Sequence, residues 1–135
     1  MTVFVDTSAF YAVVDRDDEN HRAASRVWMD LLDRLDRDIG LLTNNYVLLE
    51  TLALLQHRIG AAALRTFHQD VQPLVEIDWV SSQRHQAGVE AVLTAGRRKL
   101  SVVDCVSFQT MAGRGVRAAF CFDRHFREQG FEVIP

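Results

Sequence analysis

Short apolar segments rich in β-branched and aromatic residues alternate with longer segments of helical periodicity along the whole chain. The first pattern predicts strands and the second predicts helices. The expected strands are Thr2–Val5, Ile39–Thr43, Leu74–Val80, Ala118–Phe122 and Glu132–Ile134. The first expected helix starts at Ala9, the second runs from His21 to about Asp36, and the third runs from Asn44 or Asn45 to about Ile59. Further helices are expected over Ala61–Val71, over Ser81–Gly96, and from Ser101 to Gly113–Gly115. Asp123–Glu128 is expected to be a turn or a short helix.

This order predicts an α/β fold, in which a mostly parallel central sheet of about five strands is flanked by helices. The 135 residues contain no Gly/Pro/Ser-rich break, so we expect one domain over residues 1–135. No apolar run reaches the ~20 residues of a membrane span, and the first residues lack the basic charge of an export signal. Cys105 and Cys121 are interpreted as reduced, partly buried thiols, and we expect a cytoplasmic protein.

Acidic residues stand where several of these elements meet. Asp6 and Asp123 directly follow strands, and Asp104 lies in the first turn of the helix that Ser101 opens. In open α/β sheets, sites form beyond the carboxyl ends of the strands, so these side chains are expected to share one edge. Each has a simpler alternative: Asp6 as a helix cap, Asp104 as part of a capping box, and Asp123 as a surface loop acid.

Glu50 has a different setting, because it is the only charged residue in the apolar segment Tyr46–Leu55. A helix that is apolar on all faces is buried or forms an interface. An unpaired buried carboxylate is costly and usually has a cation or a partner. We therefore interpret Glu50 as a member of the same acidic site; the alternative is exposure at a gap to solvent.

Four carboxylates at one edge would repel one another and raise each other's pKa values. A hard divalent cation removes this penalty, and Mg²⁺ and Mn²⁺ prefer oxygen ligands. The histidines give no close metal-binding pair, and the two cysteines are sixteen residues apart. The histidines are His21, His57, His68, His85 and His125. The expected cofactor is therefore Mg²⁺, or Mn²⁺, held by Asp6, Glu50, Asp104 and Asp123.

The charge balance gives no overall basic footprint, since the net charge is −3. Fourteen of the fifteen cationic residues are arginine, the side chain suited to bidentate phosphate contact. Local basic clusters predict a phosphate-facing rim around the acidic edge. They are Arg97, Arg98 and Lys99, then Arg114 and Arg117, then Arg124 and Arg127.

Four short motifs resemble the PIN-domain family, and within it the VapC-type toxin ribonucleases of toxin–antitoxin pairs. They are V-F-V-D-T-S-A at the start, N-Y-V-L-L-E-T, L-S-V-V-D-C-V-S-F, and F-C-F-D-R-H-F-R-E-Q-G-F near the end. The ordered set covers essentially the whole chain. The resemblance implies a metal-dependent endoribonuclease of PIN-like fold, an RNA substrate, a homodimer, and a cognate antitoxin that blocks the site.

The resemblance also assigns residues. The family's acids fall on Asp6, Glu50, Asp104 and Asp123, and its small hydroxyl residue falls on Ser8, expected to orient Asp6 or a water. Members often carry Ser or Thr just before or two before the last acid, but this chain has Phe122 and Cys121 there. The expected RNA contacts are Arg97, Arg98, Arg124 and Arg127.

Rival functions fit less well. A haloacid-dehalogenase-like phosphatase normally has a second aspartate two residues after the first, where this chain has Ser8. A receiver-like domain needs a lysine at a late strand end, but Lys99 follows a helix, and a structure-specific DNA nuclease of this superfamily would normally be longer. The non-enzymatic alternative is a catalytically degenerate PIN domain that binds RNA or a protein partner, against which the presence of all four acids argues.

Overall fold

The computed structural model describes residues 1–135 and contains one five-stranded sheet in the order β3-β2-β1-β4-β5. All neighbouring strands are parallel. The strands are β1 (Thr2–Val5), β2 (Gly40–Asn44), β3 (Glu76–Asp78), β4 (Ala118–Phe120) and β5 (Glu132–Ile134). The helices are α1 (Thr7–Val14), α2 (His21–Arg34), α3 (Asn45–Arg58), α4 (Ala61–Thr66), α5 (Ser82–Ala95), α6 (Val102–Arg114) and α7 (Arg124–Glu128).

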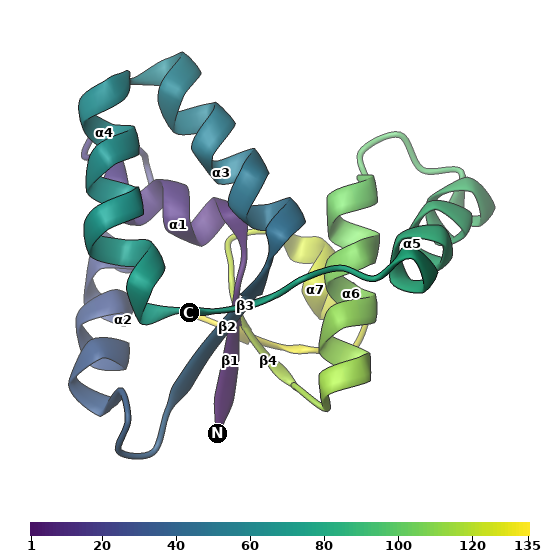
Figure 1. The fold of residues 1–135 in the computed structure, drawn as a ribbon. Helices are drawn as coiled ribbons and strands as arrows, with labels where there is room; N and C mark the ends of the chain where they lie inside the picture. The colour runs from purple at the N-terminus through teal and green to yellow at the C-terminus, as the bar shows by residue number, and fades with distance from the viewer.

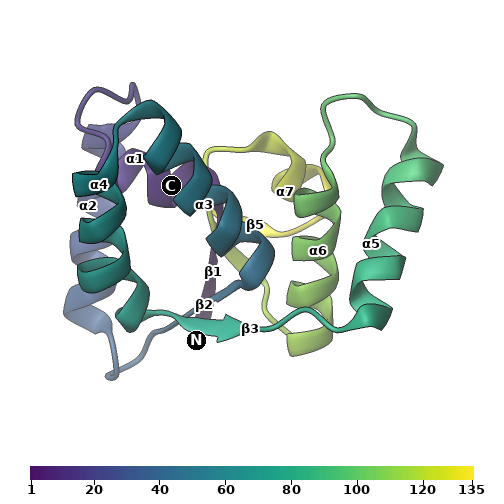
Figure 2. The same cartoon turned by 45° about the horizontal axis from the view of Figure 1, so that its top comes forward.

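The helices cover both faces of the sheet. Figure 1 shows α1, α2 and α4 on one side and α5 and α6 on the other. In the turned view of Figure 2, α7 lies beside α6, and α3 lies between the two groups of helices. The central strand β1 is the best covered, and its residues Val3, Phe4 and Val5 have no exposed surface. The α/β prediction is confirmed, with five strands that are all parallel.

Two predicted strands are shorter than expected, and their ends show why. Leu74 belongs to a 3₁₀ turn, and the Val80 amide donates to Asn45 Oδ1 at 2.7 Å, so only Glu76–Asp78 pairs with β2. The backbone of β4 leaves the sheet after Phe120, and the Phe122 amide donates to Ser8 Oγ at 2.9 Å. The segment predicted as one helix over Ala61–Val71 is helical throughout, but it changes to a π turn at Phe67.

Asn44 joins the end of β2 to the start of α3 and ties both to α6. Its side chain accepts a hydrogen bond from the Val47 amide at 2.9 Å, which makes it the N-cap of α3. Its amide nitrogen donates to Ser107 Oγ and Thr110 Oγ1 of α6 at 3.3 and 3.2 Å. Because Asn44 is fully buried, these bonds satisfy a polar group that would otherwise destabilise the core.

Phe126 holds the short helix α7 in place. It is fully buried, and its ring packs edge-on against Phe108 of α6, with centroids 5.0 Å apart. A five-residue helix has little stability of its own, so this contact fixes where α7 begins. Cys105 and Cys121 are both free and buried, and burial raises the pKa of the Cys121 thiol to about 12. None of the helices combines the length and apolarity needed to cross a bilayer.

Gly88 allows α5 to approach α6 closely. A Cβ atom added there would lie 2.4 Å from Val106 Cγ2 and 3.1 Å from the Val106 backbone nitrogen. Both distances are shorter than ordinary contacts, and the second involves backbone that cannot move independently. Gly113 of α6 differs, because the atom nearest to its added Cβ is the terminal nitrogen Nη2 of the flexible Arg84 side chain.

We predict that Gly88→Ala lowers the free energy of unfolding by about 1–3 kcal/mol, the usual range for overpacking. The clash with Val106 has to outweigh the roughly 1 kcal/mol by which alanine favours a helix over glycine. Urea denaturation followed by circular dichroism measures the change. Gly113→Ala is the matched control, and it is expected to cost less, because the added Cβ meets the end of the Arg84 side chain, which pairs with Asp78 at 2.7 Å but can shift, and no backbone atom. Equal effects of the two substitutions would show that the approach at Gly88 is not tight.

Candidate active site

The ends of β1 and β4 place two aspartates at one edge of the sheet. β1 ends at Val5 and Asp6 follows, while β4 ends at Phe120 and Asp123 comes three residues later. The Asp6 amide donates to the Phe120 carbonyl at 3.1 Å, which fixes the two strand ends side by side. Each aspartate is then the N-cap of the next helix, Asp6 of α1 and Asp123 of α7.

Ser8 holds the Asp6 carboxylate. Its hydroxyl and its amide both donate to Asp6 Oδ2, at 2.7 and 3.2 Å, and the hydroxyl oxygen accepts from the Phe122 amide. No hydrogen bond involves Asp6 Oδ1. Asp6 is only 4% exposed, and this burial raises its pKa to about 7, although the hydrogen bonds from Ser8 lower it and the charges of Asp104 and Asp123 raise it further.

Asp104 comes to the same edge from the first turn of α6. It forms a capping box with Ser101: the Asp104 amide donates to Ser101 Oγ at 3.0 Å, and the Ser101 amide donates to Asp104 Oδ2 at 3.1 Å. Its pKa is raised to about 6, chiefly by burial and also by the nearby charge of Asp123. The capping alternative that the sequence left open is thus correct for Asp104, and it coexists with membership of the acidic cluster.

Asp123 and Asp104 approach each other around His125. The His125 Nδ1 atom lies 2.9 Å from Asp123 Oδ1 and 3.6 Å from Asp104 Oδ2. One ligand atom from each of the three side chains fits within a 4.8 Å group. Asp123 Oδ1 also accepts the His125 amide hydrogen at 2.8 Å, which orients the carboxylate.

The structure corrects the expectation about histidines, because His125 belongs to the cluster. The sequence search required two histidines at close spacing, whereas here the partners are carboxylates on α6 and before α7. The sequence signal that could have identified His125 is its position two residues after Asp123, at the start of a helix. An N-cap aspartate and a residue two positions later both lie at the helix start.

Neither Glu50 nor Asp6 belongs to the close-set group of Asp104, Asp123 and His125. The helix α3 is not buried all round: Leu49 is 69% exposed and Glu50 is half-buried. Glu50 lines a hollow of about 270 Å³ with Tyr46, Leu49, Ala53 and Val103. Glu50 of α3 thus shares this hollow with Val103, the residue of α6 that directly precedes Asp104.

The basic residues divide between the two ends of the sheet. Arg97 and Arg98 lie in the loop before α6, at the acidic edge, and Arg97 pairs with Glu128 of α7 at 2.8 Å. Arg124 and Arg127 line a hollow with Asp123.

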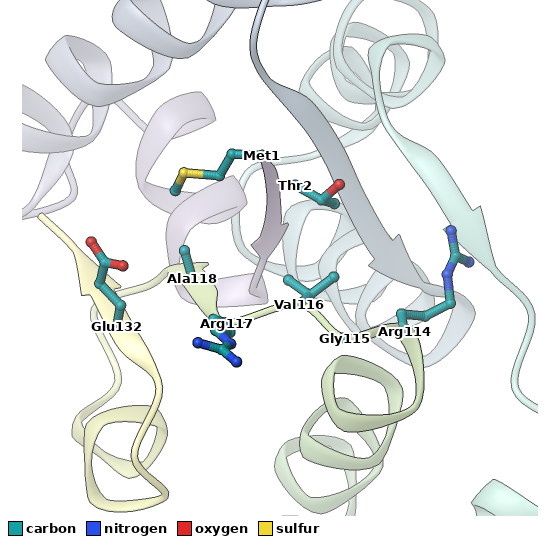
Figure 3. A pocket seen from close by; sticks show the side chains of 8 residues that line it. All are labelled: Met1, Thr2, Arg114, Gly115, Val116, Arg117, Ala118 and Glu132. Atoms are coloured by element: carbon teal, nitrogen blue, oxygen red, sulfur yellow. The ribbon is translucent and has the colours of Figure 1, made fainter.

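Arg114 and Arg117 lie elsewhere, so this part of the predicted rim is wrong. Figure 3 shows both among the side chains that line a hollow with Met1 and Glu132, where β1 and β4 begin. This is the end of the sheet opposite to Asp6. Arg114 is also engaged in ion pairs with Glu76 and Asp78 at 2.9 and 2.8 Å.

The donor set suits a hard divalent cation. Three carboxylates approach one another in a mostly buried place, and the pKa values of Asp6 and Asp104 are both raised. No lysine or arginine forms an ion pair with any of the three. Oxygen ligands of this kind are those that Mg²⁺ and Mn²⁺ prefer, so the residues present fit such an ion.

Comparison with known proteins agrees with this geometry. The family described as PIN domain matches residues 3–132. The 23S rRNA-specific endonuclease VapC20 of Mycobacterium tuberculosis is 32% identical over 98% of both chains, in each of two strains. The crystal structure of that VapC20, described as a sarcin-ricin loop cleaving toxin, superimposes with a TM-score of 0.84 at 31% identity and covers 98% of this chain and 99% of its own. With its five-stranded parallel sheet, its buried aspartates at one edge and a family match along nearly its full length, this chain belongs to the PIN-domain family.

Proposed function

We propose that this protein is a Mg²⁺- or Mn²⁺-dependent endoribonuclease and the toxin of a type II toxin–antitoxin pair. The observation that carries the proposal is the close approach of Asp104 and Asp123, with the buried Asp6 near enough for both of their charges to raise its pKa. The similarity to VapC20 supports RNA as the substrate class and makes the sarcin–ricin loop of 23S rRNA the first sequence to test.

In this proposal, Asp6, Asp104 and Asp123 hold the cation, and Glu50 completes the set from α3. A bound cation would supply positive charge beside the phosphodiester and would favour the deprotonation of a water for hydrolysis of a phosphorus–oxygen bond. Ser8 keeps the Asp6 carboxylate in one orientation, because both of its hydrogen bonds reach Oδ2 and leave Oδ1 available. Arg97, Arg98, Arg124 and Arg127 bind the flanking phosphates of the RNA.

A protein partner fits the exposed apolar side chains around this edge. Leu49 is 69% exposed and Trp79 is 72% exposed, and Val102 begins α6 beside the cluster. Large apolar side chains gathered at a functional edge mark interaction surfaces. We propose that a cognate antitoxin covers them and that the protein is a cytoplasmic homodimer, as the VapC-type relationship implies.

We predict that Asp6→Asn abolishes RNA cleavage and growth arrest while it keeps the fold. Asparagine matches the shape of aspartate and can still accept the Ser8 bonds, but it lacks the charge that binds the cation. Cleavage of purified ribosomes in Mg²⁺ would show a loss of about 10²- to 10³-fold, the range seen when a group that stabilises charge in the transition state is removed. Circular dichroism confirms folding, and growth after induction of each gene tests the toxin role.

Two results would contradict this assignment. Cleavage by Asp6→Asn at the wild-type rate would show that the site is elsewhere. Protection of RNA without cleavage by the wild type in Mg²⁺ would favour the binding-only PIN domain over the enzyme.

We predict that the metal-free protein loses stability as the pH rises from about 4 to about 7. The pKa of Asp6 is about 7 in the folded state against 3.8 as its ordinary value, so the folded state binds the proton more tightly. The stabilising contribution is complete below about pH 4 and is lost as the pH passes the folded pKa. Three pKa units correspond to about 4 kcal/mol as an upper bound.

Asp6→Asn isolates this effect from other groups, such as Glu128, whose pKa is lowered and whose contribution has the opposite sign. In EDTA at pH 8, the variant is expected to have a higher Tm than the wild type, and the two should converge near pH 4. Mg²⁺ at pH 8 should then raise the Tm of the wild type only. A Tm difference between the two metal-free proteins that does not change with pH would contradict the raised pKa of Asp6.

We predict that the double variant Arg98→Ala/Arg127→Ala binds RNA more weakly and with a smaller salt dependence. Each phosphate contact on single-stranded RNA contributes about 0.7 to the slope of log K against log salt, so the slope should fall by up to about 1.4. Fluorescence anisotropy in the inactive Asp6→Asn background measures binding without cleavage. Arg117→Ala, at the opposite end of the sheet, is the matched control and should leave the slope unchanged.

A further inference from the structure

His125 carries a feature that the four acids do not explain. Its side chain is 8% exposed, and neither ring nitrogen has a hydrogen-bond partner. Buried polar atoms are almost always hydrogen-bonded, so an exception calls for a ligand or another compensating group. The Nδ1 atom is 2.9 Å from Asp123 Oδ1, which is a hydrogen-bond distance without hydrogen-bond geometry.

We propose that His125 supplies a nitrogen ligand to the cation site, which makes it an imidazole–carboxylate site that favours Mn²⁺ over Mg²⁺. This inference rests on the cation site of the proposed function and adds a ligand that the family's acidic set does not contain. Imidazole suits transition metals, whereas carboxylate-only sites suit Mg²⁺ as well as Mn²⁺. The sequence analysis considered only pairs of histidines and the two cysteines, so it did not consider a single histidine between carboxylates.

The distances support a shared ion. Ligands in neighbouring positions of an octahedral ion lie roughly 3 Å apart when each bond is about 2.1 Å. His125 Nδ1 lies 2.9 Å from Asp123 Oδ1 and 3.6 Å from Asp104 Oδ2. The three side chains therefore have nearly the spacing that one ion requires, before any ligand moves.

The backbone around His125 is also fixed, as a ligand site needs. The His125 amide donates to Asp123 Oδ1, so residue and carboxylate move together. The next residue, Phe126, is buried against Phe108 of α6, the helix that carries Asp104. The ring is thus held between two carboxylates by packing that does not depend on a hydrogen bond of its own.

Pulsed EPR of bound Mn²⁺ tests the proposal directly. In the wild type, we expect hyperfine coupling to a directly bound ¹⁴N nucleus, which a purely structural histidine would not produce. His125→Phe fills the volume without a donor, and His125→Asn offers an oxygen near the position of Nδ1. Both should lose the coupling. Calorimetry should show Mn²⁺ affinity reduced by roughly 10- to 100-fold, with a smaller change for Mg²⁺ in His125→Asn.

The controls separate this proposal from the proposed function. His57→Phe, at an exposed histidine of α3, should keep both the coupling and the affinity, and Asp104→Asn should lose Mn²⁺ binding. Mn²⁺ bound to the wild type without nitrogen coupling, or no Mn²⁺ binding at all, would overturn the inference even if RNA is cleaved. Nitrogen coupling in a protein that cuts no RNA would refute the proposed function alone. If His125→Phe does not fold, the wild-type spectrum and His125→Asn decide.

Discussion

Burial of two carboxylates, Asp6 and Asp104, close to the half-buried Asp123 is the constraint on which the rest of this structure depends. Asp6 and Asp104 are almost fully buried, and both carry raised pKa values whose largest cause is that burial. No ion pair with a lysine or arginine offsets this cost at the cluster, although such pairs form at several other places in the chain. The apolar packing of the sheet and of α6 and α7 therefore has to hold in place groups that repel one another.

Their position at helix N-termini stabilises these three carboxylates. Asp6 and Asp123 accept hydrogen bonds from first-turn amides of α1 and α7, and Asp104, in the first turn of α6, accepts from the amide of the N-cap residue Ser101. Amides at a helix N-terminus carry partial positive charge, so the same position favours an anion and orients it. Capping and site formation, which look like competing explanations in the sequence, are thus one physical arrangement. A capped carboxylate has its direction set and keeps lone pairs for a cation.

The sequence predicted the parts of the site that follow from topology. Strands β1 and β4 are parallel neighbours, so acids that follow them had to meet at one edge, and the helix opened by Ser101 had to bring Asp104 near them. The expected full burial of Glu50 was wrong, because α3 leaves Leu49 in solvent and Glu50 half-buried, while its membership of the site stays a prediction. His125 was missed because the search required a second histidine, whereas its partners are Asp123, two residues before it, and Asp104 of α6. The packing of Phe126 on Phe108 holds α7, and with it the imidazole, against α6.

At the strand ends, too, the local sequence pattern predicts a strand, but tertiary contacts decide where the strand stops. The Ala118–Phe122 segment is apolar enough for a strand, yet its last amide bonds to Ser8 and not to the sheet. That single bond connects the loop before Asp123 to the residue that holds Asp6, so a distortion of either loop would reach both carboxylates. Phe122 and Cys121 stand where related proteins often have a hydroxyl residue beside the last acid. In this chain the orienting contact to Asp123 comes from the His125 backbone. A site assembled in this way depends on the position of α7 as much as on the acids themselves.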